Sequence, residues 1–154
     1  MALALERMIA PVTGVPAPWS TEQTDSKLDI SVVFTSVDAT LAALKVAGNL
    51  ASNLGSRITL IVPQIVPYPL PLSSPPVLVD LSERRLRVIA NNCRVETRVS
   101  IYLCRDPLET LQSVLKPHSL IVLGSRKRWW PTAEKRLAAK LRRAGHEVVV
   151  TERN

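Results

Sequence analysis

The stretch DPLETLQSVLKPHSLIVLGSR, residues 106–126, decides the fold class. Asp106 suits the N-cap of a helix, Pro107 suits the first helical position, and Glu109 adds a negative charge to the first turn. An amphipathic helix is therefore predicted at 105–115. The apolar run at 119–124 follows directly and predicts a strand that is buried on both faces. A helix that leads into such a strand is typical of a parallel α/β sheet.

The same alternation extends on both sides of this stretch. Short β-branched or aliphatic runs predict five strands, at 30–36, 57–66, 95–103, 119–124 and 147–152. Apolar residues at helical spacing predict four helices, at 38–55, 79–93, 105–115 and 131–143. Strands that alternate with helices pair in parallel through right-handed crossovers. We therefore predict an α/β domain with a doubly wound, Rossmann-like, five-stranded parallel sheet.

Local signals set the expected ends of these elements. Gly55 and Gly145 are expected to stop the helices that precede them. Asp80 is expected as an N-cap, with Glu83 completing a capping box. Half of the twelve prolines lie between residues 63 and 76, so we expect Pro63 to interrupt the second strand and a loop to follow it.

Length and composition divide the chain into a tail and one domain. The chain has 154 residues, which suits a single domain at 29–154. Residues 1–28 are rich in Pro, Ser, Thr and Gly and predict a flexible N-terminal tail or linker, with one or two helical turns at 2–10. Trp19 is expected to be a partly exposed tail residue, and the alternative is docking onto a neighbouring groove.

The bulk chemistry narrows the class of protein. Aromatic residues make up only 4% of the chain, so the core must be aliphatic, and the net charge is +7. No run is long and apolar enough to span a bilayer, and no signal peptide is evident. Cys93 and Cys104 lack metal-type spacing and are expected to be reduced thiols. A cytoplasmic location is the expectation.

Ligands of doubly wound sheets bind at the carboxyl ends of the strands, where the winding direction reverses. Thr35 and Ser36 follow the first predicted strand, and residues 124–128 follow the fourth. This edge is the predicted binding site.

Residues 29–152 resemble a universal stress protein. The features that carry the resemblance are ALKVAGNLASNLGSRITLIVPQIV at 43–66 and, more specifically, DPLETLQSVLKPHSLIVLGSR at 106–126. The resemblance implies the strand order 3-2-1-4-5, a role in stress responses, and often a homodimer built on the last strand. That strand contains Glu147, Val148, Val149, Val150 and Thr151 and has few charges inside it, which favours antiparallel pairing with a second copy.

The resemblance also implies where a nucleotide would bind. Nucleotide-binding members carry Gly-x-x-Gly after the fourth strand and a Gly-Ser or Gly-Thr pair nine residues later. Here Gly124 matches the first glycine, whereas Lys127 replaces the second, and the later pair falls on Leu137 and Ala138. The family's aspartate at the end of the first strand falls on Thr35.

Side chains in place of these glycines oppose binding of a triphosphate, because glycine lets backbone amides approach an anion. Trp129 and Trp130 are also expected to occupy the groove, or to cap the core beside Tyr68. The main hypothesis is therefore a dimeric regulatory or interaction module with an unknown protein partner and no conventional ATP site. The alternative is a binder of ATP or another phosphorylated molecule through a degenerate site: Thr35, Ser36, Asp38, Gly124, Ser125, Arg126 and Lys127.

The basic helix at 131–143 allows three interpretations. Ala133, Leu137, Leu141 and Ala144 form a narrow apolar stripe, which favours a helix packed on the sheet with a solvated basic face. An interfacial membrane contact would need the same stripe. Sequence-blind contact with nucleic-acid phosphates lacks an accompanying motif, so no specific nucleic acid is expected.

Catalytic chemistry has little support. His118 and His146 fall in turns before strands, at the opposite end of the sheet from the predicted site. No nucleophile elbow, metal-ligand cluster or complete P-loop is present in the sequence. Cys104 is expected to be buried and inert, with an oxidant-sensing thiol beside Arg105 as the alternative. We therefore expect no enzyme activity, no metal and no resident cofactor.

Overall fold

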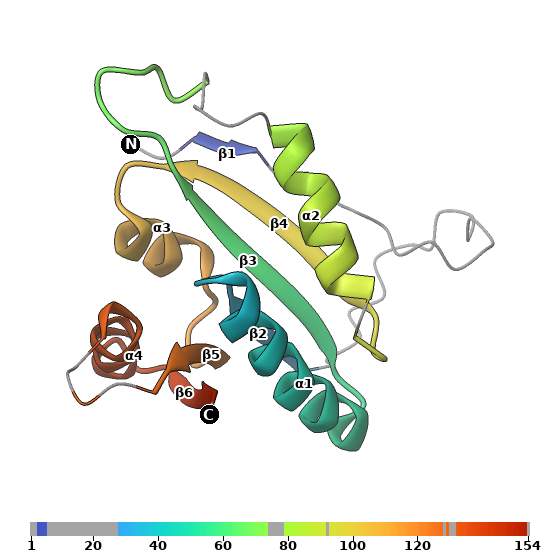
Figure 1. Cartoon of the computed structure of the whole chain (residues 1–154). Coiled ribbons are helices and arrows are strands. Elements are labelled where there is room, and N and C mark those ends of the chain that lie inside the picture. The colour runs from blue at the N-terminus through green and yellow to red at the C-terminus, as the bar shows by residue number, and fades with distance from the viewer. Residues whose placement is uncertain are drawn as a thin grey trace.

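The computed structural model describes residues 3–5, 28–73, 79–91, 93–127, 129 and 132–153 (Figure 1). Within these residues, ten elements follow one another: β1 Leu3–Leu5, β2 Asp29–Val33, α1 Val37–Leu54, β3 Arg57–Ile65, α2 Val79–Asn91, β4 Thr97–Cys104, α3 Pro107–Val114, β5 Leu120–Arg126, α4 Ala133–Arg143 and β6 Glu147–Arg153.

The strands form one sheet with the order β1-β4-β3-β2-β5-β6. The strands from β2 to β6 are mutually parallel, so the predicted order 3-2-1-4-5 is confirmed. The structure adds β1, which pairs antiparallel to β4 with Leu3 opposite Leu103. Residues 3–5 thus form a strand where helical turns were expected, because β4 would otherwise leave its outer backbone groups unpaired. Residues 6–27, with Trp19, lie outside the described residues.

Helices cover both faces of the sheet (Figure 1). On one face, Ile30, Leu60 and Val99 pack with residues of α1 and α2. On the other face, Val33, Ile61 and Ile121 pack with residues of α3 and α4. Alternate residues of each central strand thus enter opposite core layers, which is why these strands read as continuous apolar runs.

β3 continues through Pro63 to Ile65, so the expected interruption is wrong. The carbonyl of Ile61 accepts the N–H of Phe34, which shows that Ile61 directs its backbone groups toward β2. Pro63 is two residues further along and faces the same side. β2 has already ended at Val33, so the N–H that proline lacks has no ladder partner to lose.

Most of the expected helix ends are confirmed. Asp106 accepts hydrogen bonds from the N–H groups of Leu108 and Glu109. Gly55 ends α1 in the left-handed conformation at φ 63°, and Gly145 has φ 94°. The predicted cap of α2 is wrong, because the helix begins at Val79 and includes Asp80.

The strand and helix around the basic segment differ from the prediction. β5 extends past Gly124 to Arg126, because β6 pairs with it as far as Arg126 opposite Arg153. α4 begins at Ala133, and Thr132 is its N-cap. Leu141 is buried as expected, whereas Ala133 and Ala144 are exposed and Ala138 is buried instead. Among the described residues, no helix has the length and apolarity needed to cross a bilayer.

Candidate ligand-binding edge

Thr35 and Gly124 meet where β2 and β5 end side by side. The Thr35 hydroxyl donates to the carbonyl oxygen of Gly124 at 3.0 Å. The N–H of Thr35 donates to the hydroxyl of Thr40 at 3.2 Å. These bonds tie the end of β2 both to β5 and to the first turn of α1. Thr35 therefore has a structural role at this edge.

Ser36 and Asp38 begin α1 beside this junction. The Ser36 hydroxyl accepts the N–H of Ala39 at 3.4 Å and caps the helix. Asp38 is exposed in the first turn, where its negative charge is favoured by the helix dipole. Thr35, Ser36 and Asp38 thus lie together after β2, as predicted, and the Ser36 hydroxyl is engaged in capping α1.

Gly124 is required by packing. A Cβ on residue 124 would lie 1.9 Å from the carbonyl oxygen of Ala39 and 2.4 Å from its carbonyl carbon. The backbone of α1 therefore passes directly over β5 at this point. This contact explains why glycine is present even though the rest of the phosphate-loop pattern is missing.

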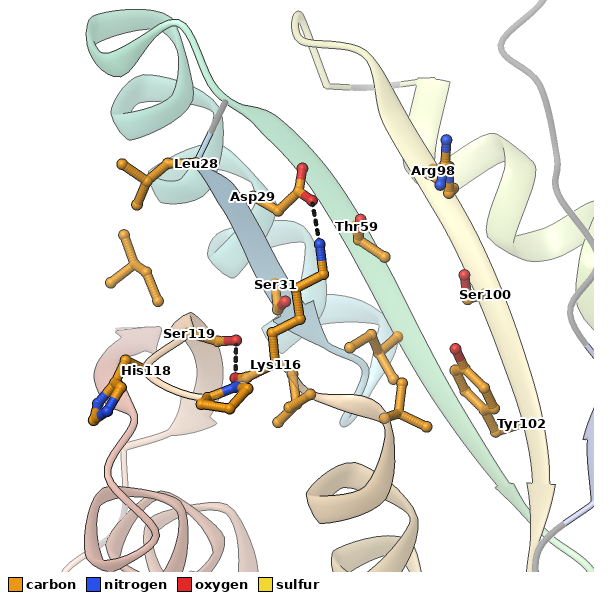
Figure 2. Close-up of a pocket in the computed structure, with 15 residues that line it drawn as sticks. Leu28, Asp29, Ser31, Thr59, Arg98, Ser100, Tyr102, Lys116, His118 and Ser119 are labelled. Atoms are coloured by element: carbon orange, nitrogen blue, oxygen red, sulfur yellow. Dashed lines mark hydrogen bonds and ion pairs between the residues drawn. The ribbon is translucent and has the colours of Figure 1, made fainter. Parts of the chain in front are cut away.

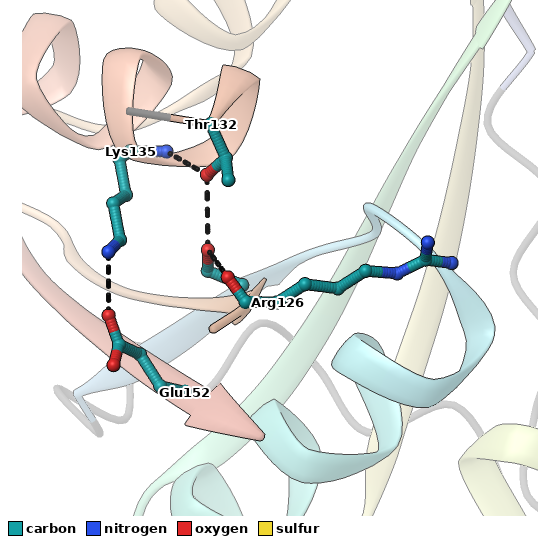
Figure 3. A network of polar contacts seen from close by, with 5 residues as sticks. Arg126, Thr132, Lys135 and Glu152 are labelled. Carbon is teal, nitrogen blue, oxygen red and sulfur yellow. Dashed lines mark hydrogen bonds and ion pairs between the residues drawn. The ribbon is translucent and has the colours of Figure 1, made fainter. Parts of the chain in front are cut away.

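Ser125 and Thr132 form a polar link between β5 and α4. Figure 3 shows Thr132 beside Lys135 at the start of α4. Ser125 is fully buried. Its hydroxyl donates to the carbonyl of Arg126 at 3.2 Å and lies 3.1 Å from the Thr132 hydroxyl, which in turn accepts the N–H of Lys135 at 3.3 Å. Since the Ser125 hydroxyl is buried within the helix cap, it is not presented to a ligand.

Charged side chains flank this link. Lys135 pairs with Glu152 at 2.7 Å. The hydrogen bond and charge of Lys135 lower the pKa of Glu152. Arg126 and Lys127 are both exposed. β5 thus ends in a buried hydroxyl that stabilises the fold and an exposed cation, and a second exposed cation follows it.

Two grooves open at the carboxyl edge. One, of about 530 Å³, is mainly apolar and is lined by residues such as Phe34, Val62 and Ile65. The other, of about 440 Å³, lies between α3 and α4 and includes Arg136 and Lys140. Both are lined by Thr35, Pro107 and Leu137. Leu137 therefore stands between the two grooves. Gly124 lines neither of them.

Trp129 does not fill either groove. Its side chain is fully exposed, so the expectations that Trp129 occupies the groove or caps the core are wrong. The residue lies in the connection from β5 to α4, outside the regular hydrogen-bonded elements that would hold it against the sheet. Arg128, Trp130 and Pro131 lie outside the described residues.

Arg105 has a role that sequence reasoning missed. Its guanidinium donates to the carbonyls of Val66 at 2.7 Å and Leu70 at 2.6 Å, and it lies 4.0 Å from the ring centre of Tyr68. Arg105 thereby anchors the proline-rich loop to the end of β4. No local motif marks this role, because the loop carbonyls are 35 and 39 residues away.

The thiols and histidines have structural environments. Cys104 is buried, and burial raises the pKa of its thiol, which opposes the thiolate needed for oxidant sensing. His146 Nδ1 accepts the N–H of Ser119 at 3.2 Å, and His118 Nδ1 lies 3.2 Å from the carbonyl of Gly145. Within the part of the chain that the structure describes, no three His, Cys, Asp or Glu residues cluster as metal ligands.

Comparison with known proteins supports the fold. The chain matches no protein-family model and no curated protein. It is similar to the crystal structure of a protein from the universal stress protein family from Burkholderia pseudomallei, with a TM-score of 0.56 and 19% sequence identity over 82% of this chain and 97% of that chain. The resemblance to universal stress proteins thus holds for the fold.

Proposed function

We propose that this chain is a universal-stress-protein-like regulatory or interaction module that acts as a homodimer, has no enzyme activity and does not hold ATP as nucleotide-binding relatives do. The observation that carries the proposal is that Gly124 allows the backbone of α1 to lie against β5. The backbone of Ala39 lies directly against this glycine, so packing accounts for the glycine without a bound phosphate. Ser125 likewise serves the cap of α4.

Leu137 adds a second obstacle. Its side chain lines both grooves, where a glycine would leave backbone accessible to a ligand. A bulky apolar side chain at this position supplies no hydrogen-bond donor for a phosphate. The groove lined by Phe34 and Val62 is mainly apolar. An apolar lining is poorly suited to a triphosphate.

A thermal-shift titration with ATP and Mg²⁺ tests the proposal. A ligand at about 100 times its dissociation constant stabilises the folded state by roughly 2.7 kcal/mol, so a real nucleotide site would raise Tm in a saturable way. We expect no rise at millimolar ATP beyond that caused by MgCl2 and NaCl at the same ionic strength. A saturable rise would contradict the proposal and favour the alternative, a phosphorylated ligand held near Arg136 and Lys140.

The proposed dimer would use β6. This strand is the last of the described sheet, with no neighbour beyond it among the described strands. Val148 is buried, whereas Val149 and Val150 are only partly covered. An edge strand of this kind offers unpaired N–H and C=O groups to a second copy related by a two-fold axis. Light scattering after size-exclusion chromatography measures the oligomeric state directly.

A further inference from the structure

The face of the sheet that α3 covers is left partly open. α3 has eight residues and is therefore about 12 Å long, whereas the eight-residue β4 extends over about 26 Å. A groove of about 380 Å³ lies over the exposed part of β2, β3 and β4, beside the turn from α3 to β5 (Figure 2). It lies toward the amino ends of the strands and so is separate from the edge described above.

The floor of this groove is polar across neighbouring strands. Ser31 is in register with Thr59, and Thr59 is in register with Arg98, so the three side chains form one row. Ser100 lies on β4 two residues after Arg98 and shares its face. The central strands of a doubly wound sheet are ordinarily apolar on both faces. The polar row is thus a departure from the pattern that the rest of the core follows.

Three side-chain hydroxyls belong to the floor of this groove. Ser31 is 8% exposed and Ser100 is 3% exposed, and both line the groove together with Thr59. Among the described residues, the buried side-chain atom without a hydrogen-bond partner is Ser56 Oγ, which lies outside this groove. The hydroxyls of Ser31, Thr59 and Ser100 can both donate and accept, so these side chains are suited to pairing with a bound molecule in the groove.

The charges at the rim favour an anion. Arg98 and Lys116 line the groove, and Asp29 is the one carboxylate among its described lining residues. Lys116 lies 4.0 Å from Asp29, and its side chain is 85% exposed. An ion pair with that geometry contributes little, so Lys116 is free to turn toward a ligand. Arginine and lysine only donate hydrogen bonds, so the matching ligand is rich in acceptors.

We propose that this groove, which we call the open-face groove, binds a small oxyanion, either a carboxylate or a phosphate. Arg98 and Lys116 supply the charge, and the hydroxyls of Ser31, Thr59 and Ser100 supply orienting hydrogen bonds. The volume lies near the lower end of the range for small-molecule sites and suits a compact metabolite. Planar pairing with a carboxylate or phosphate is the contact that a guanidinium makes best.

The test is a titration of the full ¹⁵N-labelled chain with malonate and, separately, with inorganic phosphate, with NaCl at matched ionic strength as reference. At least one of the two anions is expected to cause saturable amide shifts at Ser31, Thr59, Ser100 and the turn at 116–119. The anion that does so tells a carboxylate ligand from a phosphate ligand.

Two variants and one matched control complete the experiment. Arg98→Gln is expected to raise the dissociation constant for the anion at least tenfold, and Ser100→Ala is expected to raise it by a smaller factor. Arg84→Gln is the control. It changes an exposed arginine on α2, a helix that packs on the opposite face of the sheet, so this variant should bind the anion like the wild type. Shifts confined to α4, shifts that NaCl reproduces, or unchanged binding by Arg98→Gln would overturn the proposal.

Discussion

The guanidinium of Arg142 donates a hydrogen bond to the carbonyl oxygen of Val148, and the two atoms, Nη2 and O, are 2.9 Å apart. Glu147 donates its N–H to Ser119 beside β5, so the backbone groups of Val148 face the outer edge of the sheet. Arg142 therefore caps one acceptor that a partner strand would use. The groups of Val150, two residues further on, face the same edge beyond this contact.

Pairing of two β6 strands is expected to be centred on Val150. Val150→Pro removes the N–H that faces the edge and spares the bonds to β5, so it should weaken the dimer at least tenfold while the monomer stays folded. Val150→Thr keeps both the N–H and the β-branched shape and should dimerise like the wild type. Light scattering over a concentration series gives the dissociation constants, and a proline variant as dimeric as the threonine variant would exclude β6 as the interface.

Gly124→Ala should destabilise the fold. The new methyl group would overlap the backbone of Ala39, and overpacking of this kind costs about 1–3 kcal/mol. Gly48→Ala is the matched control, because its Cβ would meet only the Cys93 Sγ at 3.3 Å and alanine favours the helix. Urea denaturation measures both. Equal midpoints for the wild type and the Gly124 variant would show that α1 can move away and that packing does not require this glycine.

Cys104 should resist alkylation in the native state. Burial raises the pKa of its thiol, so the reactive thiolate is scarce, whereas Cys93 is only half-buried. Iodoacetamide followed by mass spectrometry should therefore modify Cys93 first, and both thiols should react in guanidinium chloride. Equal native rates at the two cysteines would contradict this assignment.

The same pKa shift predicts how stability changes with pH. A thiol in the unfolded chain ionises near pH 8.5, whereas folded Cys104 holds its proton to higher pH. Its contribution is therefore fully present below about pH 8.5 and decreases as pH rises toward the folded pKa. The urea midpoint is measured as a function of pH for the wild type and for Cys104→Ala. The difference between the two curves gives the contribution of Cys104 ionisation to stability. A wild-type loss above pH 8.5 no larger than that of the variant would argue against it.

Much of the scaffold could be predicted because its signals act over a few residues. Asp106 caps α3 through N–H groups two and three residues away, and Gly55 ends α1 through its own left-handed conformation. Apolar runs such as 119–124 mark strands between two helix layers. Alternation of these elements predicts parallel pairing, and the strand order came from the resemblance to universal stress proteins.

The candidate site was harder to predict, because its residues make hydrogen bonds to other segments of the chain. Thr35 meets Gly124 across 89 residues of chain, and Ser125 bonds to the helix cap that follows it. Trp129, expected to occupy the groove or to cap the core, is exposed. The polar row of the open-face groove gave no sequence signal, because its members lie on three separate strands.

The sequence by itself determined the succession of helices and strands from β2 to β6, most of the helix ends and the loss of the phosphate-loop glycines, since these depend on propensity and spacing within single segments. Only the tertiary structure decided what the surviving Gly124 does, where β1 pairs and which sheet face is left polar. Those outcomes depend on which backbones lie against one another after folding, a relation between segments that no local pattern contains.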